Sequence, residues 1–98
     1  MSVKIFIKRK FPKNQEKKLF KCIRSIRSLV PRQSGYISGE YLRSIENANE
    51  IVTISTWFSH EDWVVWFNSD QRKEIQAEID AIEGVISEHT VYRYIKTR

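Results

Sequence analysis

Two histidines, as possible bases, and a few arginines, as possible partners for an anion, are the residues of this 98-residue chain that could carry chemistry. His89 opens an alternating apolar stretch, and a neutral imidazole in such a place can take a proton from a phenol. Arg72 and Arg93 each offer a rigid guanidinium fork that can hold a phenolate or another anionic oxygen. We therefore take His89 and Arg72 as candidate catalytic residues. A plainer interpretation, as a hydrogen-bonded or solvated side chain, stays open for each, and His60 is expected to be exposed.

Aromatic side chains form a second group of candidates, because a site for an aromatic substrate needs flat apolar walls and a polar handle. The candidate substrate-binding residues are Trp57, Trp63, Trp66 and Tyr36. Trp63 and Trp66 fall at helical spacing on one segment and are followed by Phe67. Because such an aromatic face is more often part of a hydrophobic core, core packing is the alternative for the three indoles.

Several kinds of site are missing from the sequence. The single cysteine, Cys22, excludes an intramolecular disulfide and a cysteine-based zinc site. We find no glycine-rich phosphate loop, no nucleophile elbow, no metal-ligand spacing and no catalytic pair of acids, so we expect neither a metal nor an organic cofactor. No apolar run approaches the ~20 residues of a membrane span, and the first residues lack a signal-peptide pattern. We therefore expect a cytoplasmic protein.

Positive charge is concentrated in the first third of the chain. Residues 1–33 contain eleven Lys and Arg and one acid, whereas the remaining 65 residues contain six basic and eleven acidic ones. Four of the basic residues would share one helix face, which suits a nucleic-acid partner: Lys17, Lys21, Arg24 and Arg27. No nucleic-acid readout motif accompanies them, and charged faces usually serve solubility. Nucleic-acid binding is therefore the least favoured class of function.

The order of the expected elements places these candidates in one small domain. Period-two alternation predicts four strands, at residues 3–8, 36–44, 51–58 and 89–95. Apolar stripes predict a helix at 14–30 and a helical region between Ser59 and Gly84 that is interrupted at 68–70. The order β-α-β-β-α-β is the ferredoxin-like pattern. We expect an α+β domain over residues 1–98, a four-stranded antiparallel sheet with its helices on one face.

Local signals mark where the helices begin and end. Asn14 is a plausible N-cap for the first helix, which Pro31 ends. Ser59 begins a capping box, and Ser69 or Asp70 can cap the segment that follows the interruption.

The sheet is expected to pair with a second copy of the chain. Both alternating sets of strand residues include large side chains, whereas the helices can cover only one face of the sheet. An uncovered apolar face points to a homodimer, and a domain of this size gains stability when that face is covered.

Four short motifs follow one another in a characteristic order. They are Gly35-Tyr36-Ile37, the strand Ile51-Val52-Thr53-Ile54-Ser55-Thr56-Trp57, the capped helix Ser59-His60-Glu61-Asp62-Trp63 with Trp66, and the turn Asn68-Ser69-Asp70-Gln71-Arg72. Together they resemble the antibiotic-biosynthesis-monooxygenase family, over about residues 33–82 by motif and over the whole chain by order of elements. The resemblance implies ferredoxin-like subunits that pack as a dimeric α/β barrel, with a pocket between helices and sheet. It also implies that Trp57 and Trp66 line that pocket.

The resemblance implies a monooxygenase that oxygenates a small aromatic or quinol-like substrate, often without a metal or organic cofactor in this family. The protein would supply a dry pocket, a base and a hydrogen-bond donor, and the deprotonated substrate would itself donate an electron to oxygen. A non-catalytic dimer that binds a small aromatic ligand in the same pocket is the alternative. The haem-degrading branch of the family uses an Asn on the first strand and a His about ten residues after the helix Trp. Here the first strand has no Asn, and Gln76 stands ten residues beyond Trp66, so haem degradation lacks its proximal ligand.

Overall fold

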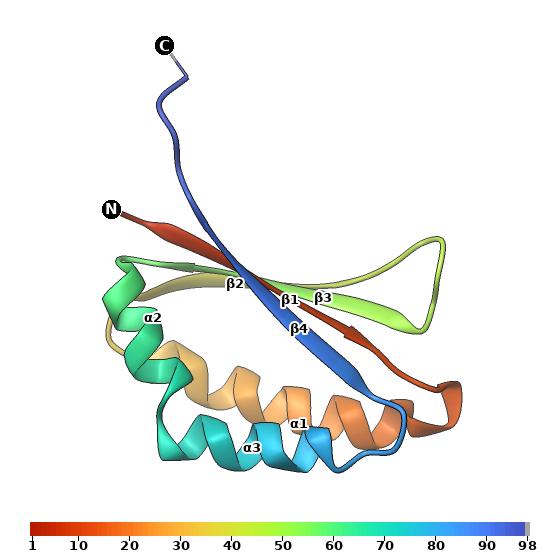
Figure 1. Ribbon diagram of the computed structural model, residues 1–98. Helices are drawn as coiled ribbons and strands as arrows, with labels where there is room; N and C mark the ends of the chain where they lie inside the picture. Colours follow the sequence, from red (N-terminus) through yellow and green to blue (C-terminus); the bar gives the residue numbers. More distant parts are fainter. Residues whose placement is uncertain (98) are drawn as a thin grey trace.

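A four-stranded sheet backed by helices forms the structure of this protein, a computed structural model that describes residues 1–97 (Figure 1). The strands are β1 (Val3–Lys10), β2 (Tyr36–Arg43), β3 (Glu50–Trp57) and β4 (Ile86–Arg93). The α-helices are α1 (Glu16–Leu29), α2 (His60–Phe67) and α3 (Asp70–Asp80), and two short 3-10 turns flank α1, η1 (Lys13–Gln15) and η2 (Val30–Arg32). Within the described residues, none of the helices has the length and apolar character of a membrane span. The predicted α+β ferredoxin-like fold is confirmed.

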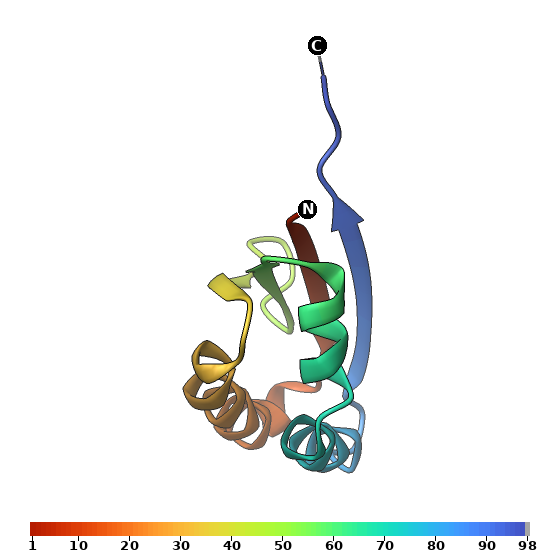
Figure 2. The ribbon, with the colours of Figure 1, turned by 90° about the vertical axis from the view of Figure 1, so that its left-hand side faces the viewer.

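The sheet has the strand order β2-β3-β1-β4, and every neighbouring pair is antiparallel. In the register of the central strand β1, Ile7 lies between Thr53 of β3 and His89 of β4. All three α-helices lie on one side of the sheet, with α1 and α3 side by side (Figures 1 and 2). Figure 2 shows β4 and α3 on one side of the molecule and β2 and α1 on the other. The β4 edge of the sheet therefore lies over α3.

Alternation along β1 divides its side chains between two environments. Val3, Ile5 and Ile7 share the face that is turned toward the helices, where Val3 and Ile5 are buried. Arg9 continues the same parity, so its side chain enters the layer between sheet and helices, and only 2% of the residue is exposed. Phe6 has the opposite parity and lies on the face that no helix covers.

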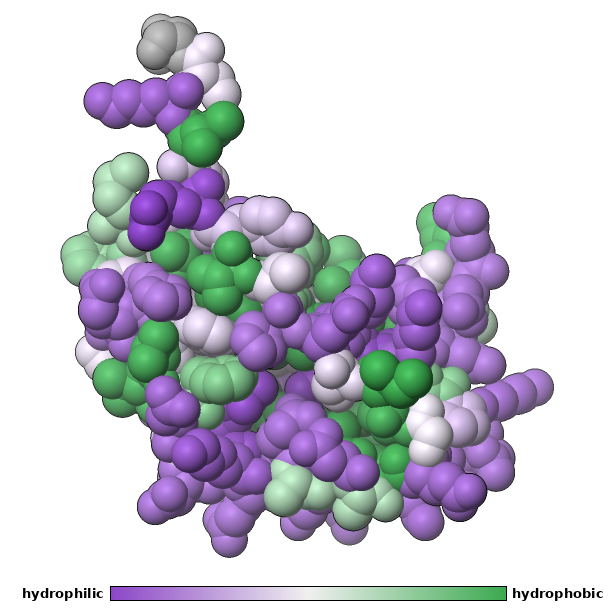
Figure 3. Space-filling view, viewed as in Figure 1, coloured by the Kyte–Doolittle hydropathy of each residue, from purple (hydrophilic) through white to green (hydrophobic). Residues whose placement is uncertain are grey.

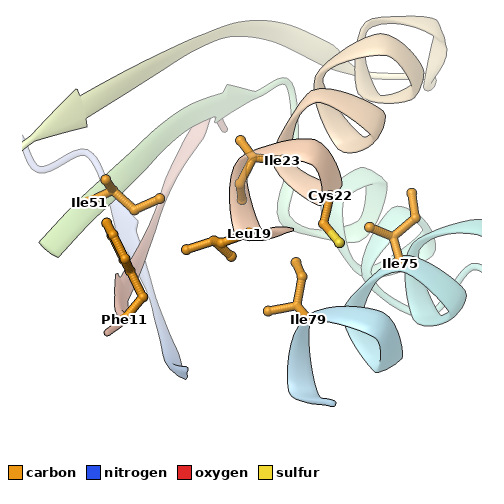
Figure 4. Close-up of a cluster of buried hydrophobic side chains, with 7 residues drawn as sticks. All are labelled: Phe11, Leu19, Cys22, Ile23, Ile51, Ile75 and Ile79. Atoms are coloured by element: carbon orange, nitrogen blue, oxygen red, sulfur yellow. The ribbon is translucent and has the colours of Figure 1, made fainter. Parts of the chain in front are cut away.

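Two clusters of buried side chains hold the helices against the sheet. The first joins α1, α3 and the sheet through Phe11, Leu19, Cys22, Ile23, Ile51, Ile75 and Ile79 (Figure 4). The second surrounds the three indoles with Val3, Ile5, Val30, Trp57, Trp63 and Trp66. In Figure 4, Cys22 of α1 points toward Ile75 and Ile79 of α3, while Leu19 extends toward the side where Phe11 and Ile51 lie. Full burial of each large apolar side chain of this kind stabilises the fold by about 1.5–3 kcal/mol.

Hydroxyl side chains begin the two later helices as the sequence predicts. The Ser59 hydroxyl accepts a hydrogen bond from the backbone N–H of Asp62 at 3.1 Å and begins α2. The Ser69 hydroxyl accepts one from the backbone N–H of Arg72 at 3.2 Å and begins α3. Each bond satisfies one of the backbone donors that the first turn of a helix leaves free. The cap of α3 also fixes the position of Arg72 on its first turn.

Several predicted boundaries differ from the structure by one to three residues, and two of these differences have a clear cause. Asn14 is not an N-cap, because it lies within η1 and Gln15 precedes α1 without any side-chain cap. The last strand does not span 89–95. β4 starts earlier and ends at Arg93, because Arg93 is already paired with Val3, where its partner β1 begins. The extent of this strand is thus set by backbone pairing rather than by alternation.

The face of the sheet without helices carries an open groove of about 650 Å³. Phe6, Val52 and Tyr92 contribute apolar surface to its lining. Beyond β4, residues 94–97 extend away from the body of the chain (Figures 1 and 2), and Ile95 is 80% exposed. This face is the uncovered apolar surface that the strand composition predicts.

Candidate functional site

A hollow of about 190 Å³ lies between the helices and the β4 edge of the sheet. Its walls come from β1, α2, α3 and β4, through Ile7, Phe67, Arg72, Gln76, Asp80, Ser87, Glu88 and His89. Figure 3 shows the side of the molecule where β4 lies in front. Hydrophilic side chains cover most of this surface, and hydrophobic patches interrupt them. The hollow therefore combines an aromatic wall with hydrogen-bonding and charged groups, which is the usual composition of a small-ligand site.

His89 forms part of the aromatic wall. Its position on β4 opposite Ile7 turns it toward the helices. The centroid of its imidazole ring lies 4.9 Å from that of Phe67 and 5.6 Å from that of Trp63. The residue is nevertheless exposed, so its ring reaches solvent as well as the hollow. An imidazole held in this way can exchange a proton with a ligand in the hollow.

Arg72 reaches the hollow from the first turn of α3. Its guanidinium carbon lies 4.2 Å from the centroid of the Phe67 ring, a cation–π contact, and 7% of the residue is exposed. Burial lowers the pKa of this guanidinium, while the carboxylate of Asp80 acts in the opposite direction. Within residues 1–97 the guanidinium has no hydrogen-bond or ion-pair partner. Two candidates from the sequence, Arg72 and His89, thus share the walls of one hollow and contact the same phenylalanine.

Arg9 is a functional candidate that the sequence analysis missed. Its Nη2 donates a hydrogen bond to Oε1 of Gln76 at 3.0 Å, whereas its Nε is buried without a partner. Burial first, and then the positive charge of Arg72, lower the pKa of Arg9 to about 10. The parity of β1 could have indicated this residue, because Arg9 falls in the same alternating set as the apolar side chains of the buried face.

Polar groups beside Arg9 complete this end of the hollow. Ser87 is paired with Arg9 across β1 and β4, and its hydroxyl oxygen is buried without a hydrogen-bond partner. Gln76 accepts from Arg9 and donates from Nε2 to Oδ1 of Asp80 at 2.8 Å. The charge of Asp80 raises the pKa of both guanidinium groups, but Asp80 is exposed and water screens this effect. Neither Ser87 nor Gln76 belongs to a motif that sequence analysis could have identified.

The four aromatic candidates lie in or beside the second core cluster. Trp57 is fully buried, and its indole N–H donates to the hydroxyl of Ser55 at 3.1 Å. The Tyr36 ring meets the Trp57 ring edge-on at 5.4 Å, and burial raises the pKa of Tyr36. Trp63 and Trp66 are also buried, and Trp63 lies behind the Phe67 and His89 rings. None of the four belongs to the wall of the hollow, and their contact with a ligand stays a prediction.

The remaining polar candidates lie elsewhere. Arg93 lines the groove on the open face of the sheet, away from the hollow. The basic residues of α1 form an exposed surface, and two of them, Arg24 and Arg27, line a separate hollow of about 350 Å³ between α1 and the strands β2 and β3. His60 is exposed at the start of α2, with its ring centroid 5.8 Å from that of Trp63. The hollow beside β4 is thus the place where the predicted catalytic groups converge.

Metal ligands are not grouped in the part of the chain that the structure describes, where no three His, Cys, Asp or Glu side chains could hold an ion together. Gln76 stands where the haem-degrading branch is expected to have a histidine, and both ends of its amide are engaged, by Arg9 and Asp80. An amide held in this way offers no nitrogen ligand to a haem iron.

The structure defines a ferredoxin-like α+β domain with a hollow between the β4 edge of the sheet and the helices. A family model described as antibiotic biosynthesis monooxygenase matches residues 2–78. The chain therefore belongs to the antibiotic biosynthesis monooxygenase family, and the resemblance found in the sequence is confirmed. A search of curated proteins gave no match.

Solved structures share this fold at low sequence identity. A variant of SnoaB, a cofactor-independent oxygenase from Streptomyces nogalater, is 17% identical with a TM-score of 0.85, over 98% of this chain and 95% of that one. A conserved protein from Methanosarcina mazei Go1 is 16% identical with a TM-score of 0.87, over 95% and 92% of the two chains. A Mycobacterium tuberculosis protein is 12% identical with a TM-score of 0.87, over 98% and 97%. At these identities the likeness establishes the fold alone.

Proposed function

We propose that this protein is a monooxygenase that oxygenates a small aromatic or quinol-like substrate in the hollow beside β4, without a metal or organic cofactor. The observation that supports the proposal is that a possible base, His89, and a cation, Arg72, both contact the ring of Phe67. The His89 imidazole lies 4.9 Å from the Phe67 centroid, and the Arg72 guanidinium lies 4.2 Å from it. Family membership and the likeness to a cofactor-independent oxygenase support the same reaction class.

The reaction begins with removal of a proton from the substrate. His89 takes the proton of an acidic CH₂ or phenol group, and Arg72 stabilises the anion that forms, since a guanidinium beside a developing negative charge lowers the barrier. The anion gives one electron to O₂, and the two resulting radicals combine to form a C–O bond. The protonated peroxide then loses water and leaves a carbonyl group. One atom of O₂ thus enters the product, and the other leaves as water.

The size of the hollow limits the substrate. Sites for drug-sized ligands measure about 300–1,000 Å³, and this hollow measures about 190 Å³. A ligand of one ring, or one ring of a larger ligand that extends into solvent, is therefore the appropriate size. The apolar surface for that ring comes from Ile7 and Phe67.

A homodimer is part of the proposal. The groove on the open face of the sheet carries Phe6, Val52 and Tyr92 beside lysines, and a second copy of the same sheet would cover these apolar groups. The extended residues 94–97 project beyond the sheet, where they could lie against the second copy. The cytoplasmic location expected from the sequence belongs to the proposal as well.

A non-catalytic dimer that binds the same ligand is the second candidate function. It uses the same hollow and the same aromatic wall, and it differs in the absence of turnover. A ligand that binds tightly, is recovered unchanged and causes no oxygen uptake would favour this candidate.

Oxygen consumption tests the proposed reaction. The purified protein is incubated with a panel of quinols and polyphenols under ¹⁸O₂, and oxygen uptake and product mass are followed. One labelled oxygen atom per product molecule is expected. No uptake across the panel would contradict the monooxygenase proposal.

Variants of the two histidines test whether His89 is the base, with His60 as the matched control. Both rings approach Trp63, at 5.6 Å for His89 and 5.8 Å for His60, but only His89 lines the hollow. His89→Ala should lower the rate of uptake by about 10²–10⁴-fold, as expected for a general base. His60→Ala should leave the rate unchanged. Equal losses in both variants would remove His89 from its proposed role.

A further inference from the structure

Buried positive charge that forms no ion pair lies in and behind the wall of the hollow. Arg72 lines the hollow and is 7% exposed, and Arg9, 2% exposed, lies behind the lining residues Gln76 and Ser87. Within residues 1–97 neither forms an ion pair, and the salt bridge that does form joins Arg43 to Glu16 at the surface. Because a buried charge costs folding free energy unless a partner compensates it, the two charges favour an anion in the hollow.

Hydrogen-bond donors in this wall and behind it have no acceptor. The Arg72 guanidinium has no hydrogen-bond partner among the described residues, and Nε of Arg9 and the hydroxyl of Ser87 are buried without one. Only Gln76 accepts from this group, through its bond with Arg9. Most buried polar groups in proteins are hydrogen-bonded, so this set of free donors is suited to an oxygen-rich anion.

A carboxylate in the wall limits the charge of that anion. Asp80 is exposed, and water screens its charge more strongly than that of the buried arginines. It would still repel a dianion such as a phosphate more than a monoanion. Glu88, paired with Lys8, has the opposite parity to Ser87 and His89 and directs its carboxylate to the open face of the sheet. A planar carboxylate matches the guanidinium fork and carries a single charge.

We propose that the hollow recognises a small aromatic carboxylate. In this arrangement the Arg72 fork and the Ser87 hydroxyl donate to the carboxylate oxygens, Arg9 supplies a second positive charge behind them, and the ring lies against Phe67 and His89. The inference rests on the proposed function and names its substrate class. Because Arg72 and His89 contact the same phenylalanine, a hydroxyl on the ring of the anchored ligand lies on the side of the base.

A pair of ligands that differ only in charge tests the inference. The affinities of 4-hydroxybenzoate and 4-hydroxybenzamide for the purified protein are measured by isothermal titration calorimetry under nitrogen, so that turnover cannot interfere. The carboxylate should bind about tenfold or more tightly than the amide, since charge-assisted hydrogen bonds are the stronger kind. Equal affinities, or binding of neither ligand at millimolar concentration, would overturn the inference.

Variants of two arginines test whether Arg72 causes the preference for the carboxylate over the amide. Arg72→Gln should reduce the carboxylate-to-amide ratio to about one, because it removes the charge and the fork together. Arg43→Gln removes one surface arginine of equal charge, and its ratio should equal that of the wild type. A ratio preserved in Arg72→Gln, or lost equally in Arg43→Gln, would assign the preference to net charge or to another surface.

The binding and oxygen-uptake experiments together distinguish a failure of the anion site from a failure of the proposed reaction. A carboxylate preference that depends on Arg72, in a protein that consumes no oxygen, leaves the anion site in place and contradicts only the monooxygenase proposal. Oxygen uptake with neutral phenols by a protein that shows no preference for the carboxylate contradicts only the anion site. Should Arg72→Gln fail to fold, Arg9→Met supplies the second variant, and its ratio should also fall.

Discussion

Arg9 and Ser87 lie opposite each other across β1 and β4, and each keeps a buried side-chain atom without a hydrogen-bond partner. Their proximity follows from strand register, because pairing of β1 with β4 places both on the face turned toward the helices. Buried polar groups are seldom left unsatisfied in a packed core. Under the proposed anion site, these two groups are left without partners at a cost in stability because a ligand would satisfy them.

Replacement of Arg9 by methionine should show how much the buried, partly unpaired guanidinium lowers the stability of the fold. The free energy of unfolding of Arg9→Met is expected to equal or exceed that of the wild type by up to about 4 kcal/mol, because an apolar side chain of similar length replaces a buried charge. Urea unfolding at neutral pH measures the difference. A variant less stable than the wild type by clearly more than the ~1 kcal/mol of the lost bond to Gln76 would contradict this expectation.

The difference in free energy of unfolding between Arg9→Met and the wild type should depend on pH. Burial lowers the pKa of Arg9 to about 10, so the folded protein binds this proton less tightly than the unfolded chain. The loss of folding stability caused by the buried Arg9 charge is complete at neutral pH, and it decreases as pH rises through about 10. The advantage of Arg9→Met over the wild type should therefore shrink in alkaline solution, and an advantage that grows there would have the wrong sign.

Tryptophan fluorescence should report which indole is near the ligand. Trp63 contacts the Phe67 and His89 rings that line the hollow, whereas Trp57 and Trp66 pack within the core cluster. Titration with an aromatic carboxylate should change the emission of the wild type, Trp57→Phe and Trp66→Phe, and the change should be lost in Trp63→Phe. Loss of the response in Trp57→Phe or Trp66→Phe instead would place the ligand beside those indoles, as the family resemblance implies.

A charge on the open face of the sheet should separate the proposed dimer. Phe6→Glu places a carboxylate in the groove that a second copy would cover, and the cost of burying that charge should shift the protein to monomers. Val65→Glu is the matched control, because Val65 is 74% exposed on α2, away from this groove. Sedimentation velocity measures both. A wild-type protein that sediments as a monomer would contradict the proposed dimer.

Cys22 should make stability depend on pH in the opposite direction to Arg9. Burial and then the charge of Glu78 raise the pKa of the thiol above its ordinary value of 9.0, so the folded protein holds the thiol proton more tightly than the unfolded chain. The stability gained in this way is complete below about pH 9 and is lost as pH rises through the raised pKa. The stability of the wild type relative to Cys22→Ala should therefore fall in alkaline solution. A constant difference would show that the thiol titrates normally.

Local sequence signals were sufficient for most of the fold. The alternation of Val3, Ile5 and Ile7 and the apolar stripe that includes Leu19 and Ile23 depend only on residue spacing, which the backbone periodicity of strands and helices imposes. The order of these elements along the chain is the ferredoxin-like pattern. Asn14 was misjudged because a 3-10 turn precedes α1, and a preference for cap positions does not distinguish between two helical turns that follow each other directly.

The candidate site was only partly visible in the sequence. His89 and Arg72 were chosen by residue type, which reflects the chemistry that each side chain can perform. Their approach to one phenylalanine, and the burial of Arg9 beside Ser87, depend on the register of β1 with β4 and on the packing of α3 beneath that edge. The contact of Arg9 with Gln76 joins residues 67 positions apart in the chain. Residue types and spacing along the chain determined which groups could react, and only tertiary packing decided which of them meet, because long-range proximity and desolvation arise when the sheet and the helices close on each other.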